Sequence, residues 1–467
     1  MLQRLEGRRG NAGHTSMDGG FNMSEIRNVG ASGKARNRRT IKVAPVTRAV
    51  RSALAVSALT LAIGFGGGAA AATPQSAAAM HALRVERQAI DFAPVFDLTA
   101  VQGLVPAGGA PAPTLIGGHY SGDVNIVNNT PIIETGAGDV TAIYGYSDTG
   151  NVSIINGALG AISAHSDFGN AIGIYGYALS GDVAITNAAS VVADAAYGLA
   201  DAIFASGNDV TVINTGSLTA TGYSWAAGIE AQAGNDVSVT NTGSITATAT
   251  YGLAYGIYAT GDASASVVNA GNITARGYYA TGIHAESGGD VTIANYAGGS
   301  IDAGTITGSA LAWGIYASSN GTDAVVQVDN SAYIHAAAVY GATGISAVAS
   351  GLGGSAVVNN DGDIVVQQNR TITSYGGYGI LAAGDAYAGI NNSGDITVTS
   401  RGPAFGLAAL STTGEASVSN SGSVVVSSSI NSTSVSPTGI LAAGGYGSAT
   451  VDNSGFVKAT GVRVASG

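Results

Sequence analysis

Aspartates recur directly before valine at the start of short apolar runs, and carboxylates at regular spacing could do chemistry. Among them are Asp139, Asp182, Asp209, Asp236 and Asp290. We expect them to start the same strand in different structural units, where they could act as acids on polysaccharide or bind calcium through oxygen. Aspartate is also a common turn residue, and one in about 30 residues differs from the tandem nonapeptide of calcium-binding β-rolls. The sequence therefore favours a turn role over catalysis or metal binding.

Other groups that support catalysis or metal binding are sparse. The 467 residues include no cysteine, which excludes disulfides, thiolate metal sites and thiol redox chemistry. The histidines lie far apart, without a pair at metal-ligand spacing. They are His14, His81, His119, His165, His284 and His335. We expect a protein without a cofactor, a metal or enzymatic activity.

Charge is distributed unevenly along the chain. The formal net charge is −11, yet 11 of the 18 lysines and arginines lie at or before Arg51. The remainder of the chain is acidic and almost free of basic residues. This balance argues against nucleic acid or an anionic membrane face as a partner.

The N-terminal region has the features of an export signal. A basic, polar stretch precedes a 13-residue apolar run from Ala53 to Phe65, and small residues at Ala69 to Ala72 offer a cleavage site before Thr73. The run is too short to span a bilayer comfortably. We expect residues 1–72 to form an extended signal peptide and residues 73–117, rich in Ala, Pro and Gly, to form a linker or an N-terminal cap. The mature protein is then expected to be exported from the cytoplasm.

The rest of the sequence is a tandem repeat. An asparagine closes an apolar run about every 30 residues, an interval that is typical of repeat architectures. These asparagines are Asn128, Asn156, Asn187, Asn214, Asn241, Asn269, Asn295, Asn330, Asn360, Asn392, Asn420 and Asn453. Residues 118–467 are therefore predicted to form one elongated repeat domain.

Each repeat contains three short blocks that alternate with the period of a half-buried strand and are bounded by turn residues. Three strands and three turns in about 30 residues match one coil of a parallel β-helix. The predicted fold class is therefore all-β, a parallel β-helix of about 12 coils with three short strands per coil. The isoleucine of each Gly-Ile-x-Ala block is expected to point inward and to stack in a core column that includes Ile229, Ile257 and Ile283.

The repeated asparagine is predicted to be structural. In a solenoid the same turn position lies directly above its predecessor, so side-chain amides can hydrogen-bond along the stack, and the glycine that follows can adopt a positive φ. The best-matching repeats place Asn214, Asn241, Asn269, Asn392, Asn420 and Asn453 in this ladder.

The residue after the inward isoleucine must point outward, because strands alternate their side chains. In several repeats this residue is a tyrosine, and four of them, Tyr144, Tyr175, Tyr258 and Tyr316, are candidate binding residues. Tyrosine suits strands for structural reasons alone. It also combines a large contact area with a polar tip, so an exposed stripe of these four would suit sugar or protein surfaces.

The repeat blocks, the long basic N-terminal region and the absence of cysteine resemble the passenger domains of bacterial autotransporters over residues 30–467. The resemblance implies a right-handed parallel β-helix that is displayed on the cell surface, often as an adhesin. It also implies export through an outer-membrane β-barrel, which would leave the mature protein at the cell surface, associated with the outer membrane, or outside the cell. The implied partner is a protein or glycan on a host or neighbouring cell.

Two features bear on that resemblance. The sequence has no C-terminal series of alternating strands with aromatic girdles, and the repeat that begins at Asn453 stops without its Gly-Ile-x-Ala block or a polar cap. We therefore expect the repeat domain to be truncated, with its translocator barrel in a missing part of the gene or in a separate chain. The alternative function is a secreted β-helix enzyme acting on polysaccharide, for which Arg276, Arg370 and Arg401 would be the assisting arginines.

Overall fold

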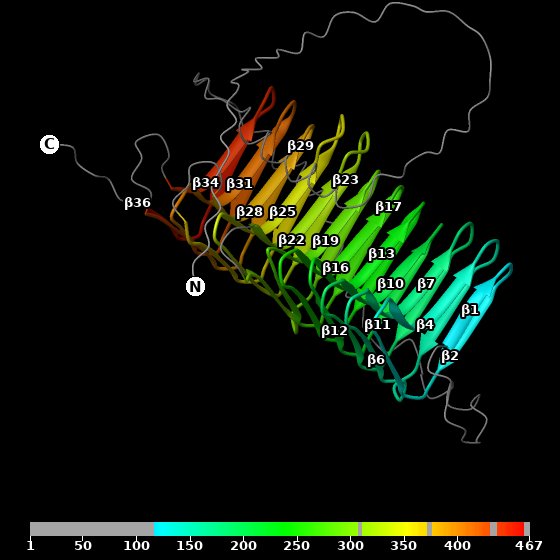
Figure 1. Ribbon diagram of the computed structural model, residues 1–467. Coiled ribbons are helices and arrows are strands. Elements are labelled where there is room, and N and C mark those ends of the chain that lie inside the picture. Colours follow the sequence, from blue (N-terminus) through cyan, green and yellow to red (C-terminus); the bar gives the residue numbers. More distant parts are fainter. Residues whose placement is uncertain (1–115, 307–310, 371–375, 430–436, 462–467) are drawn as a thin grey trace, which may run out of the picture. The chain divides into compact units, whose positions relative to one another are not determined.

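The computed structural model describes residues 116–306, 311–370, 376–429 and 437–461 (Figure 1). All of them belong to the second of two compact units, Ala69–Gly467. The predicted signal peptide, 1–72, and all but the last two residues of the predicted linker, 73–117, lie outside the described residues. The described ranges contain strands and turns only, and thus no helix of the length and hydrophobicity needed to cross a membrane.

The strands form three parallel sheets of 12 strands each. Sheet A comprises β1 (Ile116–Tyr120), β4 (Val140–Ser147), β7 (Ala171–Ala178), β10 (Leu199–Gly207), β13 (Trp225–Ala233), β16 (Leu253–Gly261), β19 (Tyr279–Ser287), β22 (Leu311–Ser319), β25 (Gly341–Ala349), β28 (Gly377–Gly384), β31 (Ala404–Ser411) and β34 (Thr438–Gly444).

Sheet B comprises β2 (Val124–Asn128), β5 (Val152–Asn156), β8 (Val183–Asn187), β11 (Val210–Asn214), β14 (Asp236–Asn241), β17 (Ser264–Asn269), β20 (Asp290–Asn295), β23 (Val325–Asn330), β26 (Ser355–Asn360), β29 (Tyr387–Asn392), β32 (Glu415–Asn420) and β35 (Ala449–Asn453).

Sheet C comprises β3 (Ile132–Gly136), β6 (Ile162–Ser166), β9 (Val191–Ala195), β12 (Leu218–Gly222), β15 (Ile245–Ala249), β18 (Ile273–Gly277), β21 (Ser300–Thr305), β24 (Tyr333–Ala338), β27 (Ile364–Gln368), β30 (Ile396–Ser400), β33 (Val424–Ser428) and β36 (Val457–Gly461).

Within each sheet a strand pairs with the third strand before it and the third strand after it in the chain, except that the first and last strands pair on one side, so three consecutive strands make one coil. The result is a parallel β-solenoid of about 11 turns, which confirms the predicted fold class. The prediction of about 12 coils corresponds to the 12 strands of each sheet. Figure 1 shows the strands of sheet A side by side in sequence order, from β1 to β34.

The core is a narrow column inside the three sheets. The register of sheet A places Ile229 between Ile203 and Ile257, and all three side chains are fully buried. Sheet C contributes Leu218 and Ile245 to the core, with the alanines Ala220 and Ala247 two residues further along the same strands. Each fully buried isoleucine stabilises the fold by roughly 1.5–3 kcal/mol. The isoleucine column predicted from the sequence is therefore the core.

The asparagine ladder runs the length of the solenoid at the C-terminal ends of the sheet B strands. Nδ2 of each asparagine donates to Oδ1 of the next in 11 successive bonds of 2.7–2.8 Å, from Asn128 to Asn453. Most of these amides also donate to the carbonyl two residues on, as Asn241 does to Gly243 at 2.9 Å. The six asparagines expected in the ladder all lie in it.

Glycine occurs two residues after the ladder asparagine for a different reason from the positive φ that was expected. Among the described glycines, positive φ occurs at Gly117, Gly298 and Gly353 only, so Gly243 does not need it. A Cβ on Gly243 would instead lie 1.8 Å from the carbonyl oxygen of Gly216 in the preceding coil. Glycine is required there because successive turns stack in close contact.

Candidate functional site

The aspartates of the repeat hold one coil to the next. Oδ1 of Asp182 accepts the backbone N–H of Asp209 at 3.1 Å, and Oδ1 of Asp209 accepts that of Asp236 at 3.1 Å. Oδ1 of Asp290 accepts the N–H of Val325 at 2.8 Å. A carboxylate that accepts a backbone N–H from the turn of the next coil has a structural role.

Asp139 does not lie in that column. It precedes β4 of sheet A, whereas Asp182 and Asp209 precede strands of sheet B. Oδ1 of Asp139 accepts the N–H of Asn170 at 2.8 Å, in the turn between sheets C and A. The expectation that all five aspartates start the same strand is therefore wrong for Asp139. The Asp-Val pair alone does not distinguish the turn before sheet A from the turn before sheet B, because an aspartate in either turn accepts a backbone N–H from the next coil.

The outer face of sheet A carries the predicted tyrosine stripe. The register aligns Tyr144 with Tyr175, and their ring centroids lie 5.1 Å apart. A second column runs beside the first, with Tyr146 and Tyr177 also 5.1 Å apart. The two columns are 6.3–6.4 Å apart, and all four rings are half-buried. We call these four residues the tyrosine columns.

The rings of the tyrosine columns are nearly parallel within each column, at 12°. Their faces are therefore turned toward one another along the solenoid axis, and their edges and hydroxyls are directed outward. Burial raises the pKa of Tyr175 to about 12, so its hydroxyl stays protonated at neutral pH. The columns thus present ring edges and hydrogen-bonding hydroxyls, which suits polar contacts more than stacking on ring faces.

The other two predicted stripe residues are buried, which contradicts their expected exposure. Tyr258 is 4% exposed and Tyr316 is 5% exposed. Both rings lie 4.9 Å from the ring of His284, and Trp225 and Tyr255 also pack against Tyr258 at 5.6 and 5.0 Å. Strand alternation gave the direction of the side chains correctly, but it contains no information on how bulky neighbours bury one another.

A buried carboxyl pair that the sequence did not suggest lies in the same region. Asp201 on β10 and Glu230 on β13 are 5% and 7% exposed. Nε1 of Trp225 donates to Oδ1 of Asp201 at 2.8 Å, and Gln232 donates to Glu230. Burial raises the pKa of Asp201 to about 7, and burial together with the nearby Asp201 raises the pKa of Glu230 well above its ordinary value. The signal in the sequence was Glu230 itself, an acid at a position that other repeats fill with aromatic residues.

His284 adds a buried polar atom to this face. Its Nε2 has no hydrogen-bond partner, and the nearest carboxylate oxygen, Oε2 of Glu286, is 3.6 Å away. The ring is sandwiched between Tyr258 and Tyr316, which hold it on the outer face of β19. The imidazole thus replaces a tyrosine ring in the stack.

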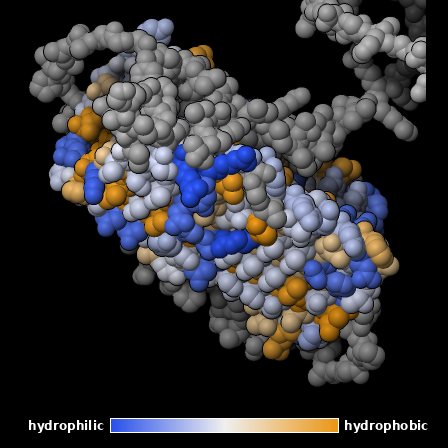
Figure 2. Space-filling view, turned by 60° about the vertical axis from the view of Figure 1, so that its left-hand side comes forward, coloured by the Kyte–Doolittle hydropathy of each residue, from blue (hydrophilic) through white to orange (hydrophobic). Residues whose placement is uncertain are grey.

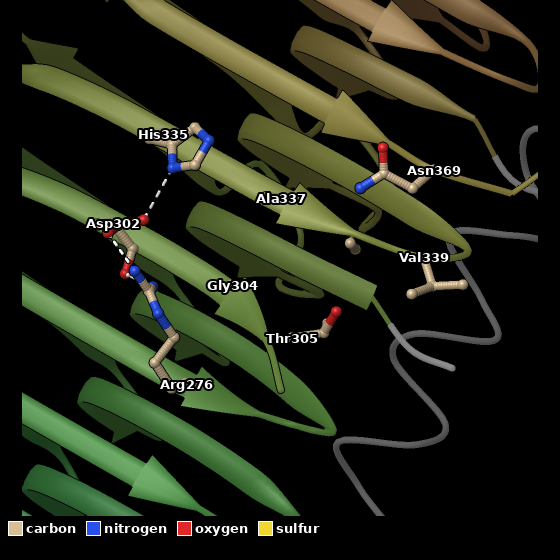
Figure 3. A pocket seen from close by; sticks show the side chains of 9 residues that line it. Arg276, Asp302, Gly304, Thr305, His335, Ala337, Val339 and Asn369 are labelled. Carbon is tan, nitrogen blue, oxygen red and sulfur yellow. Dashed lines mark hydrogen bonds and ion pairs between the residues drawn. The ribbon is translucent and has the colours of Figure 1, made fainter. Parts of the chain in front are cut away.

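A shallow cavity of about 240 Å³ lies on the outer face of sheet C (Figure 3). On one side, Arg276 donates from Nη1 to the carbonyl oxygen of Asp302 at 2.8 Å and from Nη2 to its carboxylate. Nδ1 of His335 lies 2.8 Å from the other carboxylate oxygen. Burial alone would raise the pKa of Asp302, but its bonds to Arg276 and His335 outweigh that and lower it. The guanidinium of Arg276 is already bound to the carboxylate of Asp302, so the two charges in this cavity neutralise each other.

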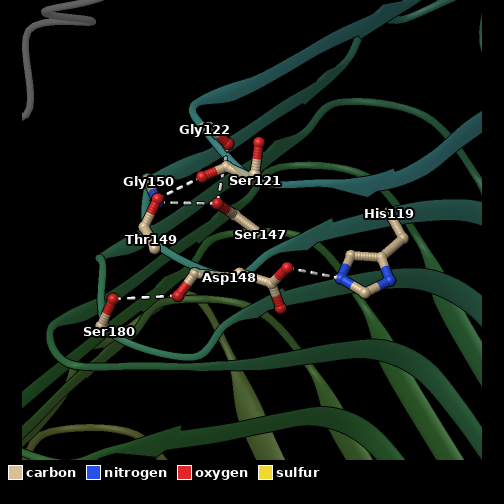
Figure 4. A network of polar contacts seen from close by, with 8 residues as sticks. All are labelled: His119, Ser121, Gly122, Ser147, Asp148, Thr149, Gly150 and Ser180. Atoms are coloured by element: carbon tan, nitrogen blue, oxygen red, sulfur yellow. Dashed lines mark hydrogen bonds and ion pairs between the residues drawn. The ribbon is translucent and has the colours of Figure 1, made fainter.

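Serine, histidine and aspartate also meet near the first coil, without the geometry of a nucleophile and its base (Figure 4). His119 Nε2 lies 3.0 Å from Asp148 Oδ2. Ser147 Oγ instead donates to the carbonyl of Gly122 at 2.7 Å and accepts the N–H of Gly150 at 2.8 Å. The hydroxyl is committed to the backbone of two turns, so this network serves to stack coils.

The fold defines the class of the protein, which is a parallel β-solenoid with three sheets. Compared with protein-family models, with curated proteins and with solved structures, the chain gives no match. Within the described residues, no group of three or more histidines and acidic residues is arranged to hold a metal ion.

Proposed function

We propose that the chain is the surface-displayed or secreted passenger of an autotransporter-like protein, and that its β-solenoid mediates adhesive contact with cells or surfaces. The fold supports this proposal, because a solenoid presents the same side-chain position in successive coils on long, regular faces. The acidic repeat domain supports a partner other than nucleic acid.

The observation that carries the proposal is the pair of tyrosine columns on β4 and β7. Four half-exposed rings, aligned in register, form one surface of large contact area with hydroxyls at its edge. Tyrosine is enriched where proteins bind other molecules because it combines a rigid apolar body with a polar tip. The proposed site is therefore Tyr144, Tyr146, Tyr175 and Tyr177, and Tyr258 and Tyr316 are left out because they are buried.

The proposed role is contact and not turnover of a substrate. The aspartates that recur in the repeat accept hydrogen bonds from neighbouring turns, and Arg276 is bound to Asp302. These groups have structural partners, so the enzyme alternative gains no support from them. On the face shown in Figure 2, hydrophobic residues form small separate groups among pale and hydrophilic ones. Such a surface suits contact with a partner at several small patches.

Export and partners belong to the same proposal. Residues 1–72 would act as the signal peptide, and an outer-membrane translocator barrel would be encoded in a longer form of the gene or in a separate chain. The partner would be a protein or glycan on a host or neighbouring cell.

The test replaces all four residues of the tyrosine columns by serine in the full chain. Binding of the labelled protein to intact animal cells and to bacterial cells is measured by flow cytometry. We expect at least about a tenfold loss of binding, because truncating several central aromatic residues of an interface removes most of its affinity. The melting temperature should change by a few degrees at most.

A matched control removes a stacked aromatic pair from the same face farther along the solenoid. Tyr378 and Phe405 lie 4.9 Å apart with ring planes at 9°, and their replacement by serine should leave cell binding unchanged. Unaltered binding of the four-serine variant would refute the assigned site. Catalytic turnover of pectin or a similar polymer by the wild-type chain, with or without calcium, would overturn the proposed function.

A further inference from the structure

A second set of aromatic side chains projects from the turn between sheet C and sheet A. In four successive coils the turn carries Phe168, Tyr197, Tyr223 and Tyr251, which are 72%, 64%, 38% and 61% exposed. Their neighbouring ring centroids are 5.7, 6.0 and 5.0 Å apart. We call this set the aromatic ridge, and it is distinct from the half-buried tyrosine columns on the sheet face.

The stacking of the turns fixes the spacing of the aromatic ridge. Each of its residues follows the end of a sheet C strand by one or two positions. The N–H of Tyr223 donates to the carbonyl of Gly198 at 2.9 Å, and the N–H of Tyr251 donates to that of Tyr223 at 2.9 Å. The backbone ladder thus continues through the turn, so the rings advance by roughly the 4.8 Å separation of paired strands.

The angle between neighbouring ring planes of the aromatic ridge increases along the axis. Phe168 and Tyr197 are nearly parallel, at 8°, whereas Tyr197 and Tyr223 are tilted by 38° and Tyr223 and Tyr251 by 53°. The tilted rings of Tyr223 and Tyr251, which are 38% and 61% exposed, present faces as well as edges, whereas Phe168 and Tyr197 are turned face to face. An exposed aromatic face is the surface on which the apolar C–H face of a sugar ring packs.

The side chains beside the Tyr223 and Tyr251 end of the aromatic ridge are hydroxylic, whereas Asp194 and His165 take the place of Thr221 in the two preceding coils. On the outer face of sheet C, Thr219 pairs in register with Thr246, and Thr221 pairs with Thr248. Thr246 pairs in turn with Thr274. These threonines are at least partly exposed, so two short columns of donors and acceptors run parallel to the ridge, as hydroxylated ligands require.

Charge near the ridge disfavours an anionic or a self-complementary partner. Next to Phe168 lie Asp167 and Asp194, whose side chains are 60% and 44% exposed. His165 contacts both carboxylates, at 3.3 and 2.9 Å, and these acids would repel a uronate or sulfated polymer. A second copy of the chain would bring the same carboxylates face to face.

We propose that the aromatic ridge, together with the threonine columns beside it, binds an extended, neutral polysaccharide that lies along the solenoid axis. Sugar rings pack on the faces that the tilted rings of Tyr223 and Tyr251 expose and against the exposed edges of Phe168 and Tyr197, and sugar hydroxyls bond to the threonines. This inference rests on the proposed contact function, for which it names a ligand class and a second surface.

The experiment measures retention of the full chain on insoluble cellulose and on immobilised xylan and mixed-linkage glucan, with polygalacturonate as the anionic polymer. The test variant carries Phe168→Ser, Tyr197→Ser, Tyr223→Ser and Tyr251→Ser. We expect binding to at least one neutral polymer, at least about tenfold weaker binding by the variant, and no binding to polygalacturonate. The control is Tyr446→Ser, which removes a tyrosine that is 91% exposed and should leave retention unchanged.

Several outcomes would overturn the inference. These are no retention on any neutral polymer, equal retention of the ridge variant, preference for polygalacturonate, or dimerisation that the ridge variant loses. Because the substituted side chains are exposed, circular dichroism and the melting curve should match those of the wild type. Cell binding that depends on the tyrosine columns while polysaccharide retention fails would refute this inference alone. Retention on polysaccharide without any cell binding would refute the proposed adhesive function alone.

Discussion

The indole Nε1 of Trp225 donates a 2.8 Å hydrogen bond to Oδ1 of Asp201, and this bond fixes one member of a buried carboxyl pair on the outer face of sheet A. The other member is Glu230, one strand further along. Other titratable groups on nearby strands of this face are Tyr175, Tyr177, Tyr255, Tyr258, Tyr279, His284, Glu286 and Tyr316. Two carboxyl groups in this setting cannot both ionise without a large cost in solvation.

The pair makes stability fall as pH rises. Burial raises the folded-state pKa of Asp201 to about 7 and raises that of Glu230 above its ordinary value, whereas both are near 4 in the unfolded chain. The folded state therefore binds more protons between about pH 4 and 7, and the stabilisation present below pH 4 is lost as pH rises through 7. We expect the free energy of unfolding, measured in urea, to fall from pH 5 to pH 8.

Glu230→Gln should remove much of this dependence. The amide keeps the shape of the carboxyl group without its charge, so the variant should be more stable than the wild type at pH 8, by on the order of 1–3 kcal/mol. At pH 4 the two proteins should differ little. Asp302→Asn is the control, because the folded-state pKa of Asp302 is lowered and its stabilisation is lost only as pH falls below about 4. Parallel profiles for wild type and Glu230→Gln would show that the pair does not titrate in this range.

Replacing a ladder asparagine by alanine should reduce stability most in the middle of the ladder. Asn241→Ala removes the acceptor of Asn214 and the donor to Oδ1 of Asn269, two bonds of 2.7 and 2.8 Å in a buried column. We expect a loss of about 3 kcal/mol in the free energy of unfolding, because buried polar groups lose their partners.

Asn453→Ala gives the matched comparison. This asparagine is the last in the described ladder and is exposed, so water can replace its partner and the loss should be about 1 kcal/mol or less. Equal losses at the two positions, read from urea midpoints at constant slope, would mean that the ladder does not act through burial.

Two glycines should respond to alanine with opposite signs. In Gly243→Ala the new Cβ would meet the carbonyl oxygen of Gly216 at 1.8 Å, so the stacked turns must separate and stability must fall. In Gly234→Ala the nearest atom is 3.8 Å away. There alanine should stabilise the fold by about 0.4–1 kcal/mol, because it restricts the unfolded chain. We expect the melting temperature of Gly243→Ala to lie below that of the wild type and the melting temperature of Gly234→Ala to lie above it. A Gly243→Ala variant as stable as the wild type would contradict the close stacking.

The regular part of this structure could be predicted from the sequence because a solenoid repeats its own register. The interval from Asn214 to Asn241 fixes a coil length, and once one coil stacks on the next, the ladder and the inward isoleucines follow from strand alternation. The same reasoning did not reveal the burial of Tyr258 and Tyr316. Burial on an outer face depends on lateral packing, which a single position in the repeat does not encode.

The aromatic ridge does not follow from the strand repeat, for a different reason. Its residues occupy a turn whose length varies, so Tyr223 follows its strand by one residue and Tyr251 follows by two. The three repeat blocks correspond to strands, and the turns between them do not repeat at a fixed length. Aligning the coils on the turn that precedes each sheet A strand would have shown Phe168, Tyr197, Tyr223 and Tyr251 in one column.

The isoleucine column should tolerate a lost methyl group but not a charge. Ile257 is fully buried and lies in register between Ile229 and Ile283. Ile257→Val should cost about 0.5–1.5 kcal/mol, the usual effect of removing one buried methylene. Ile257→Asp should cost several kcal/mol, because a carboxyl group without a partner must either ionise in the core or be protonated there. Far-UV circular dichroism followed through a thermal melt measures both, and we expect the aspartate variant to lose strand signal at a far lower temperature. If its melt coincided with that of the valine variant, Ile257 would not lie in the core that holds the coils together.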